Sequence, residues 1–158
     1  MRLRFSNAVI LEGEELEPVR GSLEVENGRI TRIGGELKPG QGINLKGAIV
    51  LPPFVNAHTH LADSGWKELY LGKTQPEVVG PAGIKHKKLA TGGPRIVRAM
   101  RAALREMRRS GTLFHLDFRE GGVRGVELMK RAIAPPPNTL ILGRGRNLVE
   151  LKRVLEMA

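Results

Sequence analysis

Residues 51–64, LPPFVNAHTHLADS, join an apolar run to two histidines, His58 and His60, that are separated by a single residue. On a helix, positions i and i+2 point in different directions, whereas on a strand they lie on the same face. If FVNAH forms a buried strand, both imidazoles can present ring nitrogens to one ion, and neutral imidazole is a common ligand of zinc. The same spacing also occurs in histidines that pack in a core or face solvent, so the pair alone leaves both interpretations open.

The sequence after residue 51 alternates between strand and helix patterns. A segment of low periodicity at 62–93 is expected to be loop-like, and it precedes GPRIVRAMRAALREMRRSG, whose apolar residues recur at helical spacing. TLFHLDF and TLILG indicate strands, while VRGVELMKRAIA and NLVELKRVLEMA indicate helices, the first of them broken by the prolines at 135–137. Strands that alternate with helices favour βαβ units and a parallel sheet.

Residues 1–50 have the pattern of β-structure. Within GSLEVENGRITRIG, two alternating runs at 22–26 and 29–33 flank Asn27-Gly28, the pair that a type I′ hairpin turn prefers. Nothing in this region is arranged for catalysis. We therefore divide the chain into a β-rich region at 1–50 and an α/β region at 51–158.

Length and composition restrict the class of protein. A chain of 158 residues is enough for one domain, or for one domain and a small second one. Cysteine is absent, which excludes disulfides and thiolate chemistry. The N-terminus lacks the features of a signal peptide, and no apolar run approaches the ~20 residues that span a bilayer. We therefore expect a cytoplasmic protein without a membrane partner.

The chain is strongly basic, with 26 lysines and arginines against 16 acidic residues and a net charge of +10. Clustered arginine, as in RIVRAMRAALREMRRS, is compatible with binding to nucleic-acid phosphates. It is equally typical of a solvated helix face, which is the interpretation we favour. Aromatic residues make up only 4% of the chain, which leaves few side chains on which bases could stack.

The order of these segments adds a resemblance. The hairpin ENGRITRIG, followed by IVLPPFVNAHTHL and then by α/β units, resembles the N-terminal part of the amidohydrolase superfamily. These metal-dependent hydrolases and deaminases are built as a (β/α)8 barrel beside a β-sandwich. The resemblance implies that His58 and His60 are the metal ligands of the first barrel strand, with zinc as the expected ion. It also implies hydrolysis of a non-peptide C–N bond in a cyclic amide or an aminated heterocycle. Pro53 stands where the family usually has glycine, which affects only the entry to the strand.

The resemblance also implies that metal ligands on later barrel strands are missing from this chain. In the family, a lysine, glutamate or histidine from the middle strands completes the metal site, together with an aspartate on the eighth strand. A whole barrel takes roughly 250 residues. The expected fold class is therefore α/β, with a β-rich, sandwich-like N-terminal region followed by an incomplete TIM-type barrel of about three βα units. We expect such a chain to be truncated, inactive alone, and in need of self-association or a complementing chain to cover its open edge.

Local residues offer a partial substitute. His115 and Asp117 share one face of the predicted strand TLFHLDF, and Asp117 could reach the metal site directly or support a ligand. They could equally pack in the core and cap the following turn. The basic run KHKK at 85–88 could bind an anionic substrate or be a solvated loop, and Asp63 is expected in a loop or cap. Two other functions remain open: a non-catalytic binding or assembly module with this fold, and a basic nucleic-acid-binding protein.

Overall fold

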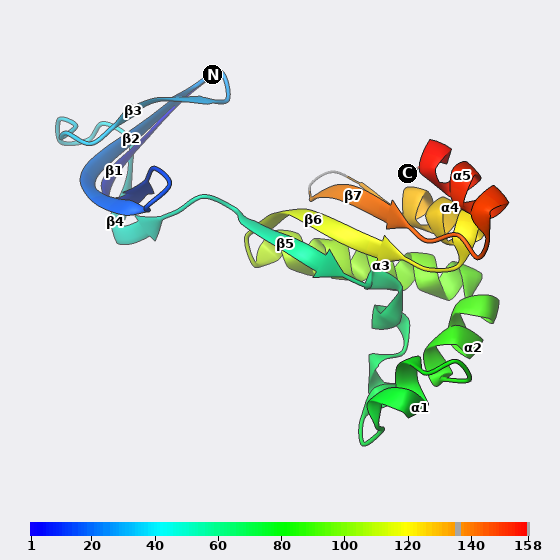
Figure 1. Ribbon diagram of the computed structural model, residues 1–158. Coiled ribbons are helices and arrows are strands. Elements are labelled where there is room, and N and C mark those ends of the chain that lie inside the picture. Colours follow the sequence, from blue (N-terminus) through cyan, green and yellow to red (C-terminus); the bar gives the residue numbers. More distant parts are fainter. Residues whose placement is uncertain (135–136, 158) are drawn as a thin grey trace. The chain divides into compact units, whose positions relative to one another are not determined.

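The computed structural model describes residues 1–134 and 137–157, which form two compact units, Met1–Pro52 and Pro53–Ala158 (Figure 1). The proline break expected at 135–137 lies largely outside the described residues. No helix in the described ranges is long and apolar enough to cross a membrane. Each unit has its own sheet and its own apolar core, and each is described separately below.

The first unit is a four-stranded sheet in the order β3-β2-β1-β4. Its strands are β1 (Arg2–Glu12), β2 (Glu17–Glu26), β3 (Arg29–Ile33) and β4 (Ile43–Val50). The predicted hairpin is confirmed: β2 and β3 pair antiparallel, and Asn27 and Gly28 both have the positive φ of a type I′ turn. The described residues of this unit form one sheet, so the expected sandwich-like arrangement of two facing sheets is not found. Its small core, around Ala8, Ile10 and Leu23, matches a single layer.

The second unit contains a parallel sheet in the order β5-β6-β7, as the alternating pattern predicted. Its strands are β5 (Phe54–Thr59), β6 (Thr112–Arg119) and β7 (Asn138–Gly143). Each strand is followed by a long helix: α3 (Gly93–Arg109), α4 (Gly122–Ala132) and α5 (Leu148–Met157). The predicted apolar stripe of α3 is buried at Ile96, Val97, Met100 and Leu104, where it packs with α4 in one core.

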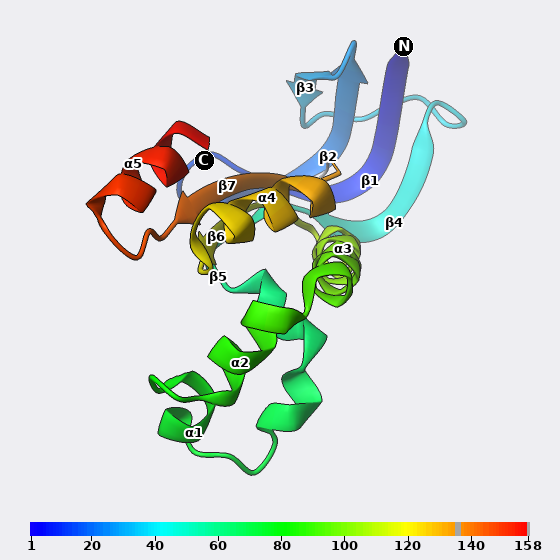
Figure 2. The same ribbon diagram turned by 90° about the vertical axis from the view of Figure 1, so that its right-hand side faces the viewer.

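The helices cover only one face of this sheet (Figures 1 and 2). Thr59, Asp117 and Ile141 are neighbours across the three strands, and all three are buried on the covered face. The opposite face exposes apolar side chains such as Phe114 and Leu140. Such a face favours association with another surface, and the expected self-association remains a prediction.

Two expectations about residues 54–93 were wrong. Five of the six residues of β5 are exposed, because β5 is an edge strand whose open face no described layer covers. The segment after β5 is not loop-like: it forms the 3₁₀ helices η1 (Leu61–Gly65) and η2 (Lys67–Tyr70) and the helices α1 (Gln75–Val79) and α2 (Ile84–Thr91). These elements are too short, and too often separated by glycine or proline, to produce a helical period in the sequence.

The ion pairs of Glu24 allow a test of how charge contributes to the stability of the first unit. Its buried carboxylate accepts hydrogen bonds from Arg2 at 2.7 Å, Arg4 at 3.1 Å and Arg32 at 3.4 Å. The hydrogen bond from Arg2 is the largest cause that lowers the pKa of Glu24 below its ordinary value. The ionised form is therefore favoured by folding, and its contribution to stability is lost as the pH falls through the lowered pKa.

We expect Glu24→Gln to destabilise the first unit near neutral pH and to reduce the loss of stability on acidification. Chemical denaturation at about pH 7 and about pH 3, on either side of an ordinary carboxyl pKa, measures both effects. Glu26→Gln, on the exposed part of the same strand, is the matched control. An unchanged pH dependence in Glu24→Gln would contradict this reading of the ion pairs.

Candidate functional site

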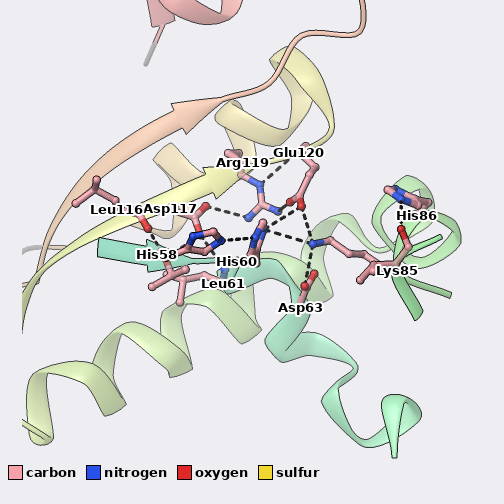
Figure 3. Close-up of polar contacts among 12 residues, drawn as sticks. His58, His60, Leu61, Asp63, Lys85, His86, Leu116, Asp117, Arg119 and Glu120 are labelled. Atoms are coloured by element: carbon pink, nitrogen blue, oxygen red, sulfur yellow. Dashed lines mark hydrogen bonds and ion pairs between the residues drawn. The ribbon is translucent and has the colours of Figure 1, made fainter. Parts of the chain in front are cut away.

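His58 and His60 meet at the carboxyl end of β5 (Figure 3). Their Nε2 atoms lie 3.1 Å apart, and the His58 ring stacks on Phe118 with ring centroids separated by 4.2 Å. Because β5 alternates its side chains, Thr59 between them points to the helix-covered face, where its Oγ1 donates to the Leu116 carbonyl at 2.8 Å. The two imidazoles therefore lie together on the open face of the sheet.

A cluster of charged groups surrounds the other ring nitrogen of His60. Its Nδ1 lies 2.9 Å from Glu120 Oε1 and 3.3 Å from Lys85 Nζ. Lys85 also forms ion pairs with Glu120 at 2.6 Å and with Asp63 at 3.0 Å. The cluster joins three parts of the chain: the turn after β5, helix α2, and the residue that follows β6 (Figure 3).

Burial and charge act in opposite directions on the two carboxylates. Burial alone would raise the pKa of Glu120, but its hydrogen bond and ion pair with Lys85 outweigh this and lower the pKa below the ordinary value. For Asp63 burial dominates, and its pKa is raised. Burial also raises the pKa of Tyr70, to about 12. Glu120 is therefore the carboxylate that stays ionised most readily beside His60.

Asp117 does not touch the two histidines. Its fully buried carboxylate lies on the helix-covered face, where Oδ1 accepts the Leu61 N–H at 2.8 Å and Oδ2 pairs with Arg119 at 3.1 Å. Leu61 directly follows His60, so Asp117 anchors the backbone at the end of the histidine pair. A direct approach of Asp117 to the pair is excluded by its position on the opposite face.

His115 makes its polar contacts with two threonines of the neighbouring strands. Its buried ring lies between Thr59, with Nδ1 3.2 Å from Oγ1, and Thr139, with Nε2 2.7 Å from Oγ1. Burial lowers the pKa of His115, which favours a neutral ring. His115 thus belongs to the polar contacts between the three strands.

The basic run at 85–88 was expected in a loop, where it would either bind an anionic substrate or be solvated. In the structure this run lies on α2, and Lys85 is 4% exposed and already paired with two carboxylates. His86 is exposed and bonds to the Val79 carbonyl at 3.3 Å. A solvated loop was also the wrong description, because one of the four side chains is buried.

Arg119 and Glu120 were not expected at the site, and Lys85 was expected only as part of a basic run that could bind an anionic substrate. A signal for Glu120 existed, because it directly follows β6 and the carboxyl ends of neighbouring parallel strands meet at one edge. No comparable signal pointed to a contact of Lys85 with His60. It stands in the segment without periodicity, and only the packing of α2 brings it to the histidines.

The two histidines have a spacing suited to one ion. Ligand nitrogens at the usual zinc distances, placed at tetrahedral angles, are about 3.3 Å apart, close to the 3.1 Å between the two Nε2 atoms. Within residues 1–134 and 137–157, no group of three or more His, Cys, Asp or Glu side chains is arranged to hold a metal. The residues present thus fit part of a four-coordinate site.

An open cavity of about 810 Å³ lies next to this cluster, at the carboxyl ends of β6 and β7. Glu120 belongs both to the cavity wall and to the cluster around His60. The rest of the lining is mainly basic and apolar, and includes His86, Leu89, Arg124, Arg144 and Arg146. Its position is the one at which parallel α/β sheets bind ligands.

Comparison with known proteins gives the wider context. A relative from Methanothermobacter thermautotrophicus that is named as an aminohydrolase is 39% identical over 146 residues, which cover 90% of this chain and 38% of the relative. An amidohydrolase from a Sargasso Sea sample has a similar fold, with a TM-score of 0.59 at 18% identity over 94% of this chain and 36% of that one. The chain belongs to the amidohydrolase superfamily.

A further solved structure has a similar fold. An uncharacterised metal-dependent hydrolase from Pyrococcus furiosus gives a TM-score of 0.60 at 13% identity, over 89% of this chain and 50% of that one. No protein-family profile matches the chain. Our chain spans little more than a third of the aminohydrolase relative, namely its N-terminal part.

The Asp117–Arg119 ion pair allows a test of stability. Asp117→Asn keeps an oxygen for the Leu61 N–H but removes the charge that faces the buried guanidinium of Arg119. We expect a loss of about 3 kcal/mol or more in the free energy of unfolding, since a buried charge loses a partner. Chemical denaturation measures it. Glu127→Gln, an exposed control, should change stability by no more than about 0.5 kcal/mol.

Proposed function

We propose that this chain contributes the first part of a metal-dependent amidohydrolase active site that hydrolyses a non-peptide C–N bond. The observation that carries the proposal is the convergence of the His58 and His60 Nε2 atoms at the carboxyl end of a parallel strand. Two imidazoles held side by side can act as ligands of one divalent ion, and zinc is the ion that we expect. A divalent ion at this position supplies Lewis acidity for the attack of water on the substrate.

The chain's own residues have separate tasks in this proposal. His58 and His60 hold the ion, and Phe118 supports the His58 ring from the open face of the sheet. Asp117 fixes the backbone after His60 through the Leu61 N–H, so its expected supporting role is kept, without direct contact to the ligands. Together these contacts restrict the motion of both rings, which is what metal ligands require.

The substrate would lie in the cavity beside Glu120. A volume of about 810 Å³ is within the range of small-molecule sites, and the cavity is bordered by several arginines. The name of the Methanothermobacter relative, aminohydrolase, supports removal of an amino group from a heterocycle more than opening of a cyclic amide.

We further propose that the three strand–helix units, β5 with α3, β6 with α4 and β7 with α5, are consecutive units of a (β/α)8 barrel. The parallel order β5-β6-β7 and the helices on one face support this arrangement. Because the described residues supply two of the four ligands that zinc takes, turnover in this proposal needs further ligands from the rest of a barrel. No observation favours the binding-module or nucleic-acid alternatives over this function.

We expect Zn²⁺ to shift the Nε2 resonances of His58 and His60 together, and to leave His86 and His115 unchanged. Side-chain ¹⁵N spectra during a zinc titration measure this. His58→Ala and His60→Ala should each remove the response of the remaining ring, because one imidazole alone does not hold the ion. His86→Ala, on an exposed helix position, is the matched control.

The activity itself is tested in a protein that combines this chain with a whole barrel. Ammonia release from amino-substituted heterocycles should disappear in the His58→Ala, His60→Ala double variant and persist in Glu127→Gln, at an exposed position of α4 outside the cavity lining. Zinc binding that survives in the double variant would overturn the ligand assignment. Full activity without either histidine would overturn the function.

A further inference from the structure

Glu120 is held from both sides at its carboxylate. Oε1 contacts Lys85 Nζ at 2.6 Å, and Oε2 pairs with Arg119 at 3.0 Å. Both cations are almost completely buried, at 4% and 1% exposure. Lysine and arginine are rarely buried without partners, so each depends on this carboxylate as much as the carboxylate depends on them. Glu120 therefore has one strongly preferred orientation.

In that orientation Oε1 lies 2.9 Å from Nδ1 of His60. An ionised carboxylate can only accept a hydrogen bond, so this contact requires a proton on Nδ1. Lys85 Nζ, at 3.3 Å from the same nitrogen, would instead require a bare Nδ1, because an ammonium group can only donate. The contact with Glu120 is the shorter one, and Lys85 Nζ already pairs with Glu120 and Asp63, so the contact with Glu120 decides between the two tautomers.

We propose that Glu120 is a positioning residue for His60, which it holds in the Nδ1–H tautomer so that the Nε2 lone pair faces His58. Lys85 and Arg119 hold Glu120 in place (Figure 3). The segment between β5 and α3 thus has a defined task, because α2 carries Lys85 into the cluster. The inference rests on the proposed metal site only for its consequence, since the tautomer is a property of the metal-free chain.

The same network reaches the backbone of the site. Arg119 links Glu120 to Asp117, and Asp117 accepts the N–H of Leu61, the residue after His60. One continuous set of contacts therefore fixes both the ring of His60, through Nδ1, and the chain that leaves it. A carboxylate that orients a metal-binding histidine in this way raises the basicity of the ligand nitrogen.

The test is the tautomer of His60 in the metal-free protein. Long-range ¹H–¹⁵N spectra of histidine-labelled chain should show His60 with its proton on Nδ1. In Glu120→Ala, the acceptor of the Nδ1 proton is gone and Lys85 remains beside this nitrogen as a donor, so the proton should move to Nε2. Glu127→Ala, which removes an exposed carboxylate from α4, should leave the spectrum of His60 unchanged.

A second readout is zinc affinity, which should fall by about 10–100-fold in Glu120→Ala and stay unchanged in Glu127→Ala. An Nε2–H tautomer in the wild-type chain would overturn the proposal, and this spectrum decides even if Glu120→Ala does not fold. An Nδ1 proton that persists in a folded Glu120→Ala would also overturn it. The expected tautomers in a chain that binds no zinc would support the positioning role and contradict the proposed metal site.

Discussion

The alternation of side chains at the end of β5 is the constraint on which the site depends. It places His58 and His60 on the open face of the sheet and Thr59 between them on the covered face. The open side carries the two imidazoles of the proposed metal site, while the covered side is fixed by polar contacts to β6. The two histidines and the residue that anchors them therefore lie on opposite faces of the same strand.

The support is built from charges that would be costly to bury singly. Lys85 and Arg119 are each almost completely buried, and the carboxylates of Asp117 and Glu120 compensate them in a connected network. Removing one member leaves an uncompensated charge in a medium of low dielectric constant. Such a network favours a single geometry around His60, which is what its proposed role as a metal ligand requires.

Much of the fold could be predicted from local pattern. The hairpin at Asn27-Gly28, the stripe of α3 and the alternation of strands with helices all depend on short-range preferences, and the structure contains each of them. The predictions failed for two features that the periodicity of apolar residues does not indicate. The segment at 62–93 has helices too short to show a period, and the exposure of β5 depends on which layers cover the sheet rather than on its own residues.

For the site, the sequence by itself determined that His58 and His60 would share a face, because a strand alternates its side chains with a fixed period of two. Only the tertiary structure decided what holds them. Lys85 and Glu120 are 35 positions apart in the chain, yet they form an ion pair of 2.6 Å. This ion pair and the contact of Lys85 with His60 depend on where α2 lies relative to the residues that follow β5 and β6. No local preference encodes that position.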